Sequence, residues 1–591
     1  MRTTGRHIRR LALLGSLCVL AAGCQLWIPS PSWTDPVPDI QVSFSEPEPV
    51  SGTVDLTATV TGFVPTQVSF VVAGHPGLTI DDLTAPWVGS LDTTQLDDGS
   101  YQIITVATDG SSWLFDLSPI EVANRPNIVV IMADDLDETT TDYWAALTQT
   151  KTLIADQGIT FDNTFATDPV CCPARATLLS GEYPHNTGVF DNTPPDGGLP
   201  AFQASGGEAD TVAVRLQNTG YATALIGKYL AFYSNHTYIP PGWDEWFAFS
   251  GSNDYYDGYD YDVSNNGVLQ HFGTTPADYQ TDVLRDQALS VLDGFEANDD
   301  QPFFMWLTPT APHLPLGPAP RHANHQWVND PLPTRPNFDE ADVSDKATWL
   351  RDGVPAVTAP FQSYLELDHR NRMGSLLALD ELVAAVHARL VTNGELDNTV
   401  IVFLSDNGYN LGAHRLAAKQ VPYEESIRVP WVMSGPGISP ATTATELVTH
   451  ADLVPTLLDV AGETATDLDG MSVEPLWSGP APPWRSDLLI EFNGTYSPTA
   501  QFHTLADVQA AITAGTTVLA PTYRAVRTDQ YLYVEWYDGP PHEYELFDIT
   551  TDPYQLDNLL VTEPGVHTAT AATLQARLDV LKTCAGITCR N

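Results

Sequence analysis

Two short apolar runs, each followed at once by acidic or amide side chains, constrain the fold of this chain more than any other feature. The runs are residues 128–132 and 400–404, and each is continuously apolar. Such runs are typical of strands that are buried on both faces of a sheet. The side chains that follow them are Asp134, Asp135, Asp406 and Asn407. The pattern therefore predicts two core strands that end in oxygen-bearing side chains.

Helical stretches lie around these strands, including residues 282–295 and 375–391. Strands that alternate with helices indicate an α/β sheet with helices on both faces, and ligands in such folds gather at the carboxyl ends of strands. The side chains at the two strand ends are thus expected to meet. Oxygen donors without histidine or cysteine suit Ca²⁺ or Mg²⁺ rather than Zn²⁺. Acidic turns at strand ends also occur without a metal, so the pattern alone leaves both interpretations open.

Residues 171–181 join two cysteines to a short run that favours a helix. Pro173 is expected at the first helical position, because its missing N–H would be unpaired there in any case. Cys171 would then lie at the positive end of a helix, with free N–H groups and with Arg175 one turn further on. This arrangement predicts a site for an anion.

The charge of the chain limits its partners. It has 26 basic and 74 acidic residues, for a formal charge of −48. A surface of this charge repels nucleic acid and anionic membranes, so no nucleic-acid partner is expected. An acidic chain that binds an anion must concentrate its few Lys and Arg side chains in one cleft, so each basic residue in a motif is informative.

The N-terminus is typical of an exported protein. Several arginines precede the apolar stretch 11–22, which is too short to span a bilayer. Residues 20–24 resemble a bacterial lipoprotein cleavage box, which would leave Cys24 as a lipidated N-terminus. Ordinary signal cleavage nearby is the alternative. We therefore expect a cell-surface or periplasmic lipoprotein that is anchored to the membrane through Cys24.

Two further regions, residues 38–123 and the C-terminal region, have sequence patterns of their own. Residues 38–123 alternate apolar and polar side chains between turns, which predicts an all-β sandwich resembling immunoglobulin-like modules, with a spacer role or, alternatively, sugar binding. Near the C-terminus, Cys584 and Cys589 indicate a small disulfide loop in an exported protein. The expected order is signal peptide 1–23, lipidated tether 24–37, sandwich 38–123, main α/β domain 124–480 and a smaller α+β subdomain 481–591.

Six motifs, in order along the chain, resemble those of the type I sulfatases, in which a motif cysteine is oxidised to formylglycine. They lie at residues 127–135, 171–188, 227–230, 311–315, 406–419 and 545–559. The resemblance implies an alkaline-phosphatase-like core, with a mixed, largely parallel sheet between helices. Within the family, the doubled cysteine and the sequence Gly227-Lys228-Tyr229-Leu230 are most similar to the glycosaminoglycan 6-O-sulfatases that act on N-acetylglucosamine.

The resemblance also implies a role for each matching position. Cys171 would become formylglycine, hydrate to a gem-diol and attack the sulfur of a sulfate ester, while Arg175 holds the diol. Lys228 and Lys419 would bind the sulfate oxygens. His313 would hold sulfate or protonate the leaving oxygen. The further catalytic candidates are His185 and His414.

A metal and a maturation enzyme follow from the same resemblance. One divalent cation, Ca²⁺ or else Mg²⁺, would polarise the sulfate and lower the pKa of the nucleophile. Its expected ligands are Asp134, Asp135, Cys171, Asp406 and Asn407. A separate formylglycine-generating enzyme would convert Cys171, and the substrate would be a sulfated carbohydrate or a small sulfate ester.

Some positions depart from the family pattern. Leu230 stands where many sulfatases carry a histidine, and Ala231 stands where the N-acetylglucosamine subgroup often has asparagine. Glu182 replaces a common basic residue, and Ala174 replaces the usual serine. One polar contact to the diol or substrate is therefore expected to be missing, which leaves the exact specificity open.

Two other functions compete with sulfate ester hydrolysis. One is a phosphodiesterase or phosphonate hydrolase of the same fold, and the other is a catalytically dead, glycan-binding surface lipoprotein. A cluster at Tyr255, Tyr256, Tyr259 and Tyr261 is a candidate for stacking on sugar. However, the alternation at residues 259–263 before Asn266-Gly267 favours a β-hairpin there.

Overall fold

The computed structural model describes residues 38–590, with gaps at 46–49, 51–52, 83, 94–95, 97–98, 123–124, 139–141, 252, 298–300, 478–481, 495–519 and 538–540. The chain divides between Pro126 and Asn127 into two compact units. The predicted signal peptide, the lipidated Cys24 and the tether lie outside the described residues. No helix in the described part of the chain is long and apolar enough to cross a membrane.

The N-terminal unit is built from antiparallel strands in two sheets. One sheet has the order β1-β2-β5, with β1 (Asp39–Phe44), β2 (Thr53–Thr61) and β5 (Trp87–Asp92). The other has the order β4-β3-β6-β7, with β4 (Thr79–Asp82), β3 (Gln67–Val72), β6 (Gly99–Thr108) and β7 (Trp113–Val122). Inward-facing side chains of both sheets, such as Leu56, Phe70 and Ile103, form one buried apolar cluster. The likeness to immunoglobulin modules stays a prediction.

A ten-stranded mixed sheet forms the centre of the second unit. In order across the sheet its strands are β14 (Val268–Phe272), β13 (Tyr261–Asn265), β12 (Glu245–Ser250), β11 (Ala222–Gly227), β15 (Phe303–Thr308), β8 (Asn127–Ala133), β16 (Thr399–Ser405), β19 (Trp431–Ser434), β9 (Ile159–Phe161) and β20 (Thr442–Ala444). The neighbours from β12 to β16 run parallel. Because β8 and β16 pair in the register Ala133↔Ser405, the residues after both strands emerge at the same edge.

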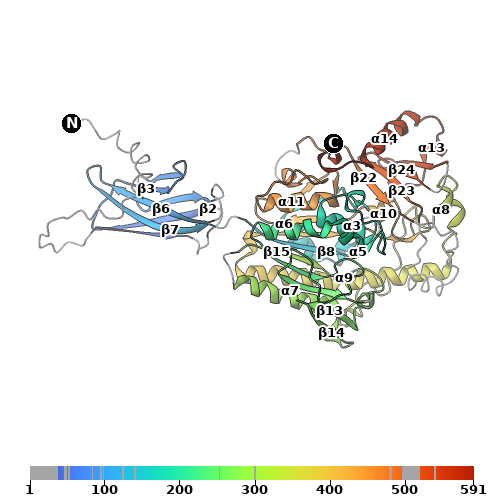
Figure 1. The fold of residues 1–591 in the computed structure, drawn as a ribbon, viewed down its shortest axis with the longest axis horizontal. Helices are drawn as coiled ribbons and strands as arrows, with labels where there is room; N and C mark the ends of the chain where they lie inside the picture. Colours follow the sequence, from blue (N-terminus) through green and yellow to red (C-terminus); the bar gives the residue numbers. More distant parts are fainter. Residues whose placement is uncertain are drawn as a thin grey trace. The chain divides into compact units, whose positions relative to one another are not determined.

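Helices cover both faces of this sheet (Figure 1). Ile128, Val130 and Met132 of β8 belong to one core cluster, which includes side chains of α3 (Cys171–Ser180), α6 (Val212–Asn218) and α11 (Leu453–Val460). Alternate residues of the same strand belong to a second cluster, with side chains of α7 (Gln280–Glu296) and α9 (Ala359–Asn393). Successive side chains of a strand point to opposite faces, so β8 is apolar throughout because both faces are covered.

A smaller antiparallel sheet, β22-β23-β24-β25, belongs to the same compact unit. Its strands are β22 (Asp487–Phe492), β23 (Tyr523–Thr528), β24 (Tyr531–Trp536) and β25 (Glu543–Asp548). Leu574, Leu578 and Leu581 of α14 (Thr568–Leu581) form a buried cluster with one face of this sheet. The predicted disulfide between Cys584 and Cys589 is confirmed.

Two local predictions have different outcomes. The hairpin is confirmed, because β13 and β14 pair antiparallel and Asn266 and Gly267 both have positive φ, as a two-residue primed turn requires. The position of Pro173 was wrong. The helix α3 begins at Cys171, so Pro173 is its third residue. The first turn of a helix has no intrahelical partner for its N–H groups, so a proline there costs no hydrogen bond.

Candidate active site

The parallel pairing of β8 and β16 brings the four predicted oxygen-bearing side chains together. The backbone N–H of Asp135 donates to Asp406 Oδ1 at 3.1 Å, and Asn407 Nδ2 donates to Asp135 Oδ1 at 2.6 Å. Asp134 and these three residues are all buried. Asp135 has a φ of 67°, a left-handed conformation that aspartate tolerates better than most residues. A hard-oxygen cluster therefore lies at the carboxyl edge of the sheet.

Cys171 lies against this cluster at the first position of α3. Its Sγ is 3.9 Å from Asp134 Oδ1 and 2.8 Å from Lys419 Nζ. The next backbone N–H, of Cys172, donates to Asn192 Oδ1 at 2.8 Å, which fixes the start of the helix. The thiol is thus held between a carboxylate and an ammonium group at the positive end of a helix dipole.

Three cationic side chains enter the same cluster. Arg175 Nε donates to Asp406 Oδ2 at 2.8 Å. Lys228 pairs with Asp134, and Lys419 pairs with Asp135. Arg175 Nη2 is 3.4 Å from Asp134 Oδ2 without hydrogen-bond geometry, and it is buried without a hydrogen-bond partner in the described structure. An unsatisfied buried guanidinium N–H favours an anion beside it.

Burial and charge act in opposite directions on the titratable groups of this cluster. Burial would raise the pKa of the Asp134 and Asp135 carboxyls, but the ammonium groups of Lys228 and Lys419 hold both pKa values below their ordinary range. Burial also raises the pKa of the Cys171 thiol, and the same two lysines oppose that rise. Both carboxylates are therefore ionised and ready to accept a cation.

His313 reaches the cluster from the loop after β15. Its Nε2 is 3.6 Å from Asp135 Oδ2, and burial lowers its pKa. The ring of Tyr256 stacks on the imidazole with centroids 4.2 Å apart, and Lys228 Nζ is 5.1 Å from the centre of the tyrosine ring. Tyr256 precedes the hairpin, in the turn Asn253–Asp257. The sequence pattern attributed this aromatic cluster to the hairpin and so missed Tyr256, although the Tyr255-Tyr256 doublet breaks the alternation.

The structure places His185 and His414 elsewhere. His185 Nδ1 is 2.8 Å from Glu491 Oε1, and its Nε2 is 2.9 Å from the carbonyl oxygen of Cys584. His414 is fully buried, with Nδ1 2.6 Å from Glu340 Oε2. Among the described residues, no hydrogen bond, ion pair or ring contact joins either imidazole to Cys171 or to the oxygen cluster. Their predicted catalytic roles thus have no support from the geometry.

The oxygen donors of this site suit a hard divalent cation, but Cys171 and His313 lie among them, so the donor set is not the oxygen-only set that the strand ends indicate. Asp134, Asp135, Cys171 and His313 each offer a ligand atom within 4.8 Å of the others, and Asp406 and Asn407 border the same space. Carboxylate and amide oxygens are the ligands that Ca²⁺ and Mg²⁺ prefer. The three buried carboxylates also supply the negative charge that such an ion needs in a site of low dielectric.

This arrangement, a buried motif cysteine among cations and oxygen ligands at a strand edge, is that of a hydrolase acting on an anionic ester. The family model described as Sulfatase matches residues 126–463. The N-acetylglucosamine-6-sulfatase of Capra hircus is 34% identical over 496 residues, which cover 79% of this chain and 85% of the relative. The chain belongs to the sulfatase family, and it is a sulfuric ester hydrolase.

Solved structures agree on the fold. A protein in complex with its substrate, D-glucosamine-2-N,6-O-disulfate, superposes with a TM-score of 0.64 at 25% identity, covering 77% of this chain and 97% of the other. A phosphonate monoester hydrolase from Silicibacter pomeroyi superposes with a TM-score of 0.59 at 21% identity, covering 78% and 96%. The predicted alkaline-phosphatase-like fold and the predicted likeness to N-acetylglucosamine-6-sulfatases are confirmed. The fold is shared with phosphonate hydrolases, so the fold alone does not distinguish the two reactions.

Proposed function

We propose that this chain removes the 6-O-sulfate of a glucosamine-type residue in a sulfated glycan, with an oxidised Cys171 as nucleophile and one divalent cation. The observation that carries the proposal is the position of Cys171, between Lys419 and Asp134 at the start of α3. The printed names of the relatives supply the sugar and the position of its ester.

The reaction proceeds by a displacement at sulfur followed by an elimination of sulfate. Cys171, converted to formylglycine and hydrated, uses one hydroxyl oxygen to form a bond to the ester sulfur, while the bond from sulfur to the sugar oxygen breaks. The neutral imidazole of His313 takes the proton of the attacking hydroxyl and passes it to the leaving sugar oxygen. The second hydroxyl then loses its proton, a carbonyl forms, and the carbon–oxygen bond to sulfate breaks. A serine has no second hydroxyl, so it would stop at a stable sulfate ester.

The cationic side chains stabilise charge during both steps. Lys228 and Lys419 face the thiol position and bind the equatorial sulfate oxygens, and Arg175 holds the diol. Donors that are fixed in a dry site lose little energy to reorganisation, which is why such groups contribute strongly to rate. Asp134, Asp135, Asp406 and Asn407 would hold Ca²⁺, or else Mg²⁺, which when bound withdraws charge from the sulfate and acidifies the nucleophile.

Maturation and location belong to the same proposal. A separate enzyme converts Cys171, and the N-terminal signal directs the chain out of the cytoplasm to a lipid anchor at Cys24, with the β unit as a spacer. Metabolic labelling with a fatty acid tests the anchor. We expect label on the wild-type chain and none on Cys24→Ala, and equal labelling of both would overturn the anchor.

A direct comparison of substrates tests the reaction. The matured enzyme is given N-acetylglucosamine-6-sulfate, the 3-sulfate isomer and a phenylphosphonate monoester, and released sulfate or phenol is measured. We expect release from the 6-sulfate to exceed release from the other two. Faster cleavage of the phosphonate would favour the competing hydrolase, and binding of the 6-sulfate without release, by a fully converted Cys171, would favour a glycan-binding role.

A further inference from the structure

One aromatic ring contacts two of the groups that carry the proposed reaction. The ring of Tyr256 lies nearly parallel to the imidazole of His313, with centroids 4.2 Å apart and planes 21° apart. Lys228 Nζ lies 5.1 Å from the centre of the same ring. Burial raises the pKa of the Tyr256 hydroxyl well above its ordinary value, so the ring is a neutral phenol. Tyr256 lies outside all six sulfatase motifs, so the family resemblance assigns it no role.

Buried contacts join the turn before the hairpin to the loop after β15. Tyr255 stacks on Phe249 of β12, with centroids 4.7 Å apart and planes 8° apart. Gln280, the fully buried first residue of α7, donates through Nε2 to the carbonyl oxygen of Tyr255. Its Oε1 accepts from Thr310 Oγ1 at 2.7 Å, and the carbonyl oxygen of Thr310 accepts from the N–H of His313 at 2.7 Å. One buried amide therefore holds the aromatic turn against the loop that carries the imidazole.

The imidazole of His313 is held at one edge by its own loop. Its Nδ1 hydrogen bonds to the carbonyl oxygen of Leu314. Because a carbonyl oxygen only accepts, Nδ1 carries the proton, and Nε2, 3.6 Å from Asp135 Oδ2, is the nitrogen that takes up a proton. One hydrogen bond fixes an edge of the ring and leaves its plane free to tilt. The parallel contact with Tyr256 fixes the plane, because the rings can tilt apart only by losing their stacking.

The orientation of this imidazole matters most when the leaving group needs a proton. Nε2 takes the proton of the attacking hydroxyl and passes it to the leaving oxygen, so the ring ends the step as it began. A sugar oxygen leaves as a strongly basic alkoxide unless it is protonated, whereas 4-nitrophenol leaves as a stable phenolate. Proton transfer requires hydrogen-bond reach, so a tilted imidazole slows the release of a sugar more than the release of 4-nitrophenolate.

We propose that Tyr256 is a positioning residue for sulfate ester hydrolysis, whose ring face holds the imidazole of His313 in the orientation in which Nε2 passes its proton to the leaving oxygen. The inference rests on the proposed function, because Tyr256 acts through the proton transfer of His313. The ring face carries the effect and the hydroxyl does not. Lys228 touches the same ring, but it binds sulfate oxygens that every sulfate ester presents, so a role through Lys228 would affect all esters equally.

Two substrates, N-acetylglucosamine-6-sulfate and 4-nitrophenyl sulfate, test this role in the matured enzyme. We expect Tyr256→Leu to lower kcat for the sugar ester about tenfold more than kcat for the aryl ester, since misplacing a catalytic group by about 1 Å costs up to about 10²-fold. KM for both esters should be unchanged, because the side chains that bind sulfate stay in place. Tyr256→Phe keeps the ring and should keep the wild-type ratio of the two kcat values. Tyr256→Met, which also lacks a ring, should behave as Tyr256→Leu.

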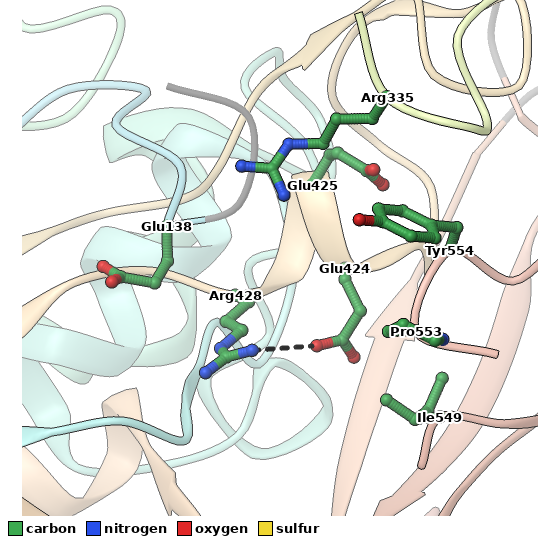
Figure 2. Close-up of a pocket in the computed structure, with 8 residues that line it drawn as sticks. All are labelled: Glu138, Arg335, Glu424, Glu425, Arg428, Ile549, Pro553 and Tyr554. Atoms are coloured by element: carbon green, nitrogen blue, oxygen red, sulfur yellow. Dashed lines mark ion pairs between the residues drawn. The ribbon is translucent and has the colours of Figure 1, made fainter. Parts of the chain in front are cut away.

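Tyr554→Leu is the matched control. Tyr554 is half-buried, as Tyr256 is, and it lines a polar pocket (Figure 2). None of the eight residues labelled in Figure 2 is a proposed metal ligand or catalytic residue, so this variant should keep both kcat values. The ratio of the two kcat values does not depend on how much of a variant is folded or converted, so the comparison holds for a variant that folds only in part.

Two kinetic outcomes would overturn the positioning role. One is an equal loss of kcat on both esters in Tyr256→Leu, and the other is the same change of ratio in Tyr256→Phe as in Tyr256→Leu. His313→Ala supplies a further criterion. Once the imidazole is gone, Tyr256→Leu should change the ratio no further, and an additional change in the double variant would contradict a role through His313.

The proposed function can fail separately from this inference. If the wild-type enzyme releases no sulfate from N-acetylglucosamine-6-sulfate, the proposed function fails, and crystal structures still decide the role of Tyr256. We expect one imidazole orientation of His313 in Cys171→Ala, and a tilted ring or several orientations in Cys171→Ala with Tyr256→Leu. The same single orientation in both structures would overturn the positioning role.

Discussion

Two clusters in the catalytic unit combine cysteine, histidine and acidic side chains, and they differ in how their polar groups are satisfied. At the strand ends, Cys171 is a free thiol and Arg175 keeps a buried N–H without a hydrogen bond in the described structure. At the C-terminus, Cys584 and Cys589 form a disulfide, and both ring nitrogens of His185 have partners. The first cluster therefore keeps a free thiol beside an unsatisfied N–H, whereas in the second cluster both thiols are oxidised and both nitrogens of His185 are used.

The C-terminal cluster is held by one carboxylate in particular. Asp469 accepts from the backbone N–H groups of Tyr183 and Gly586 at 2.7 and 2.6 Å, and from Asn186 Nδ2 at 2.8 Å. Asp469 therefore links the end of the motif at residues 171–188 to the disulfide loop. Residue type alone does not distinguish a reactive site from a structural clamp, whereas the state of the cysteines and the partners of the histidine do.

The largest effect is expected at Cys171. Cys171→Ala removes the nucleophile and should lower kcat by at least about 10³-fold, because the remaining groups only bind and polarise the ester. Sulfate release measures the loss, and mass spectrometry of the peptide that contains residue 171 should find an aldehyde in the active wild-type enzyme only. An unmodified thiol in fully active enzyme would contradict the mechanism.

The next effect concerns the cations that surround the thiol. Lys228→Met and Lys419→Met should each lower kcat by about 10²–10³-fold, the usual cost of one transition-state donor. Lys151→Met, on an exposed lysine paired with Asp156, is the control and should keep full activity. A large rise in KM with unchanged kcat would mean that the lysine binds substrate and transition state equally.

The parts of this site that could be predicted from sequence are those encoded locally. Continuous apolar runs identify β8 and β16, and parallel strands carry their carboxyl ends to one edge, so the meeting of Asp134 and Asp406 follows from pattern alone. The sequence around Lys228 and Lys419 has no pattern that indicates a site, and only the family resemblance singled these two lysines out. Their positions depend on loops, and Ala418 and Gln420, on either side of Lys419, both have positive φ.

Other contacts could not be predicted because they depend on distant segments. His185 lies in a sulfatase motif, which suggested catalysis, but its partners Glu491 and Cys584 are 306 and 399 residues further along the chain. Tyr256 stacks on His313 only because the turn before the hairpin folds over the loop after β15. Local patterns predict the elements, whereas the packing of loops decides which side chains become neighbours.

The disulfide should affect stability and leave the chemistry unchanged. Replacing both cysteines, Cys584→Ala with Cys589→Ala, should lower the free energy of unfolding by about 2 kcal/mol, the loop-entropy value for so short a loop. Denaturant unfolding measures this loss, with dithiothreitol treatment of the wild-type protein as a second route to the same state. A lower kcat for the double variant at 25 °C would contradict this expectation, because it would show that the disulfide loop also shapes the active site.

The smallest effect is a pH dependence at His185. Burial opposes protonation of this ring, but its hydrogen bond and ion pair with Glu491 raise its pKa above the ordinary value. The stabilisation is therefore fully present below the unfolded pKa of about 6.5, and it is lost as the pH rises through the raised folded value. His185→Gln removes this stabilisation. We expect it to lower the free energy of unfolding by about 1 kcal/mol at pH 5.5 and by less at pH 8.5. Thermal unfolding at both pH values measures the difference, with His271→Gln at an exposed position as control. A loss that is equal at both pH values would mean that the ring acts by packing alone.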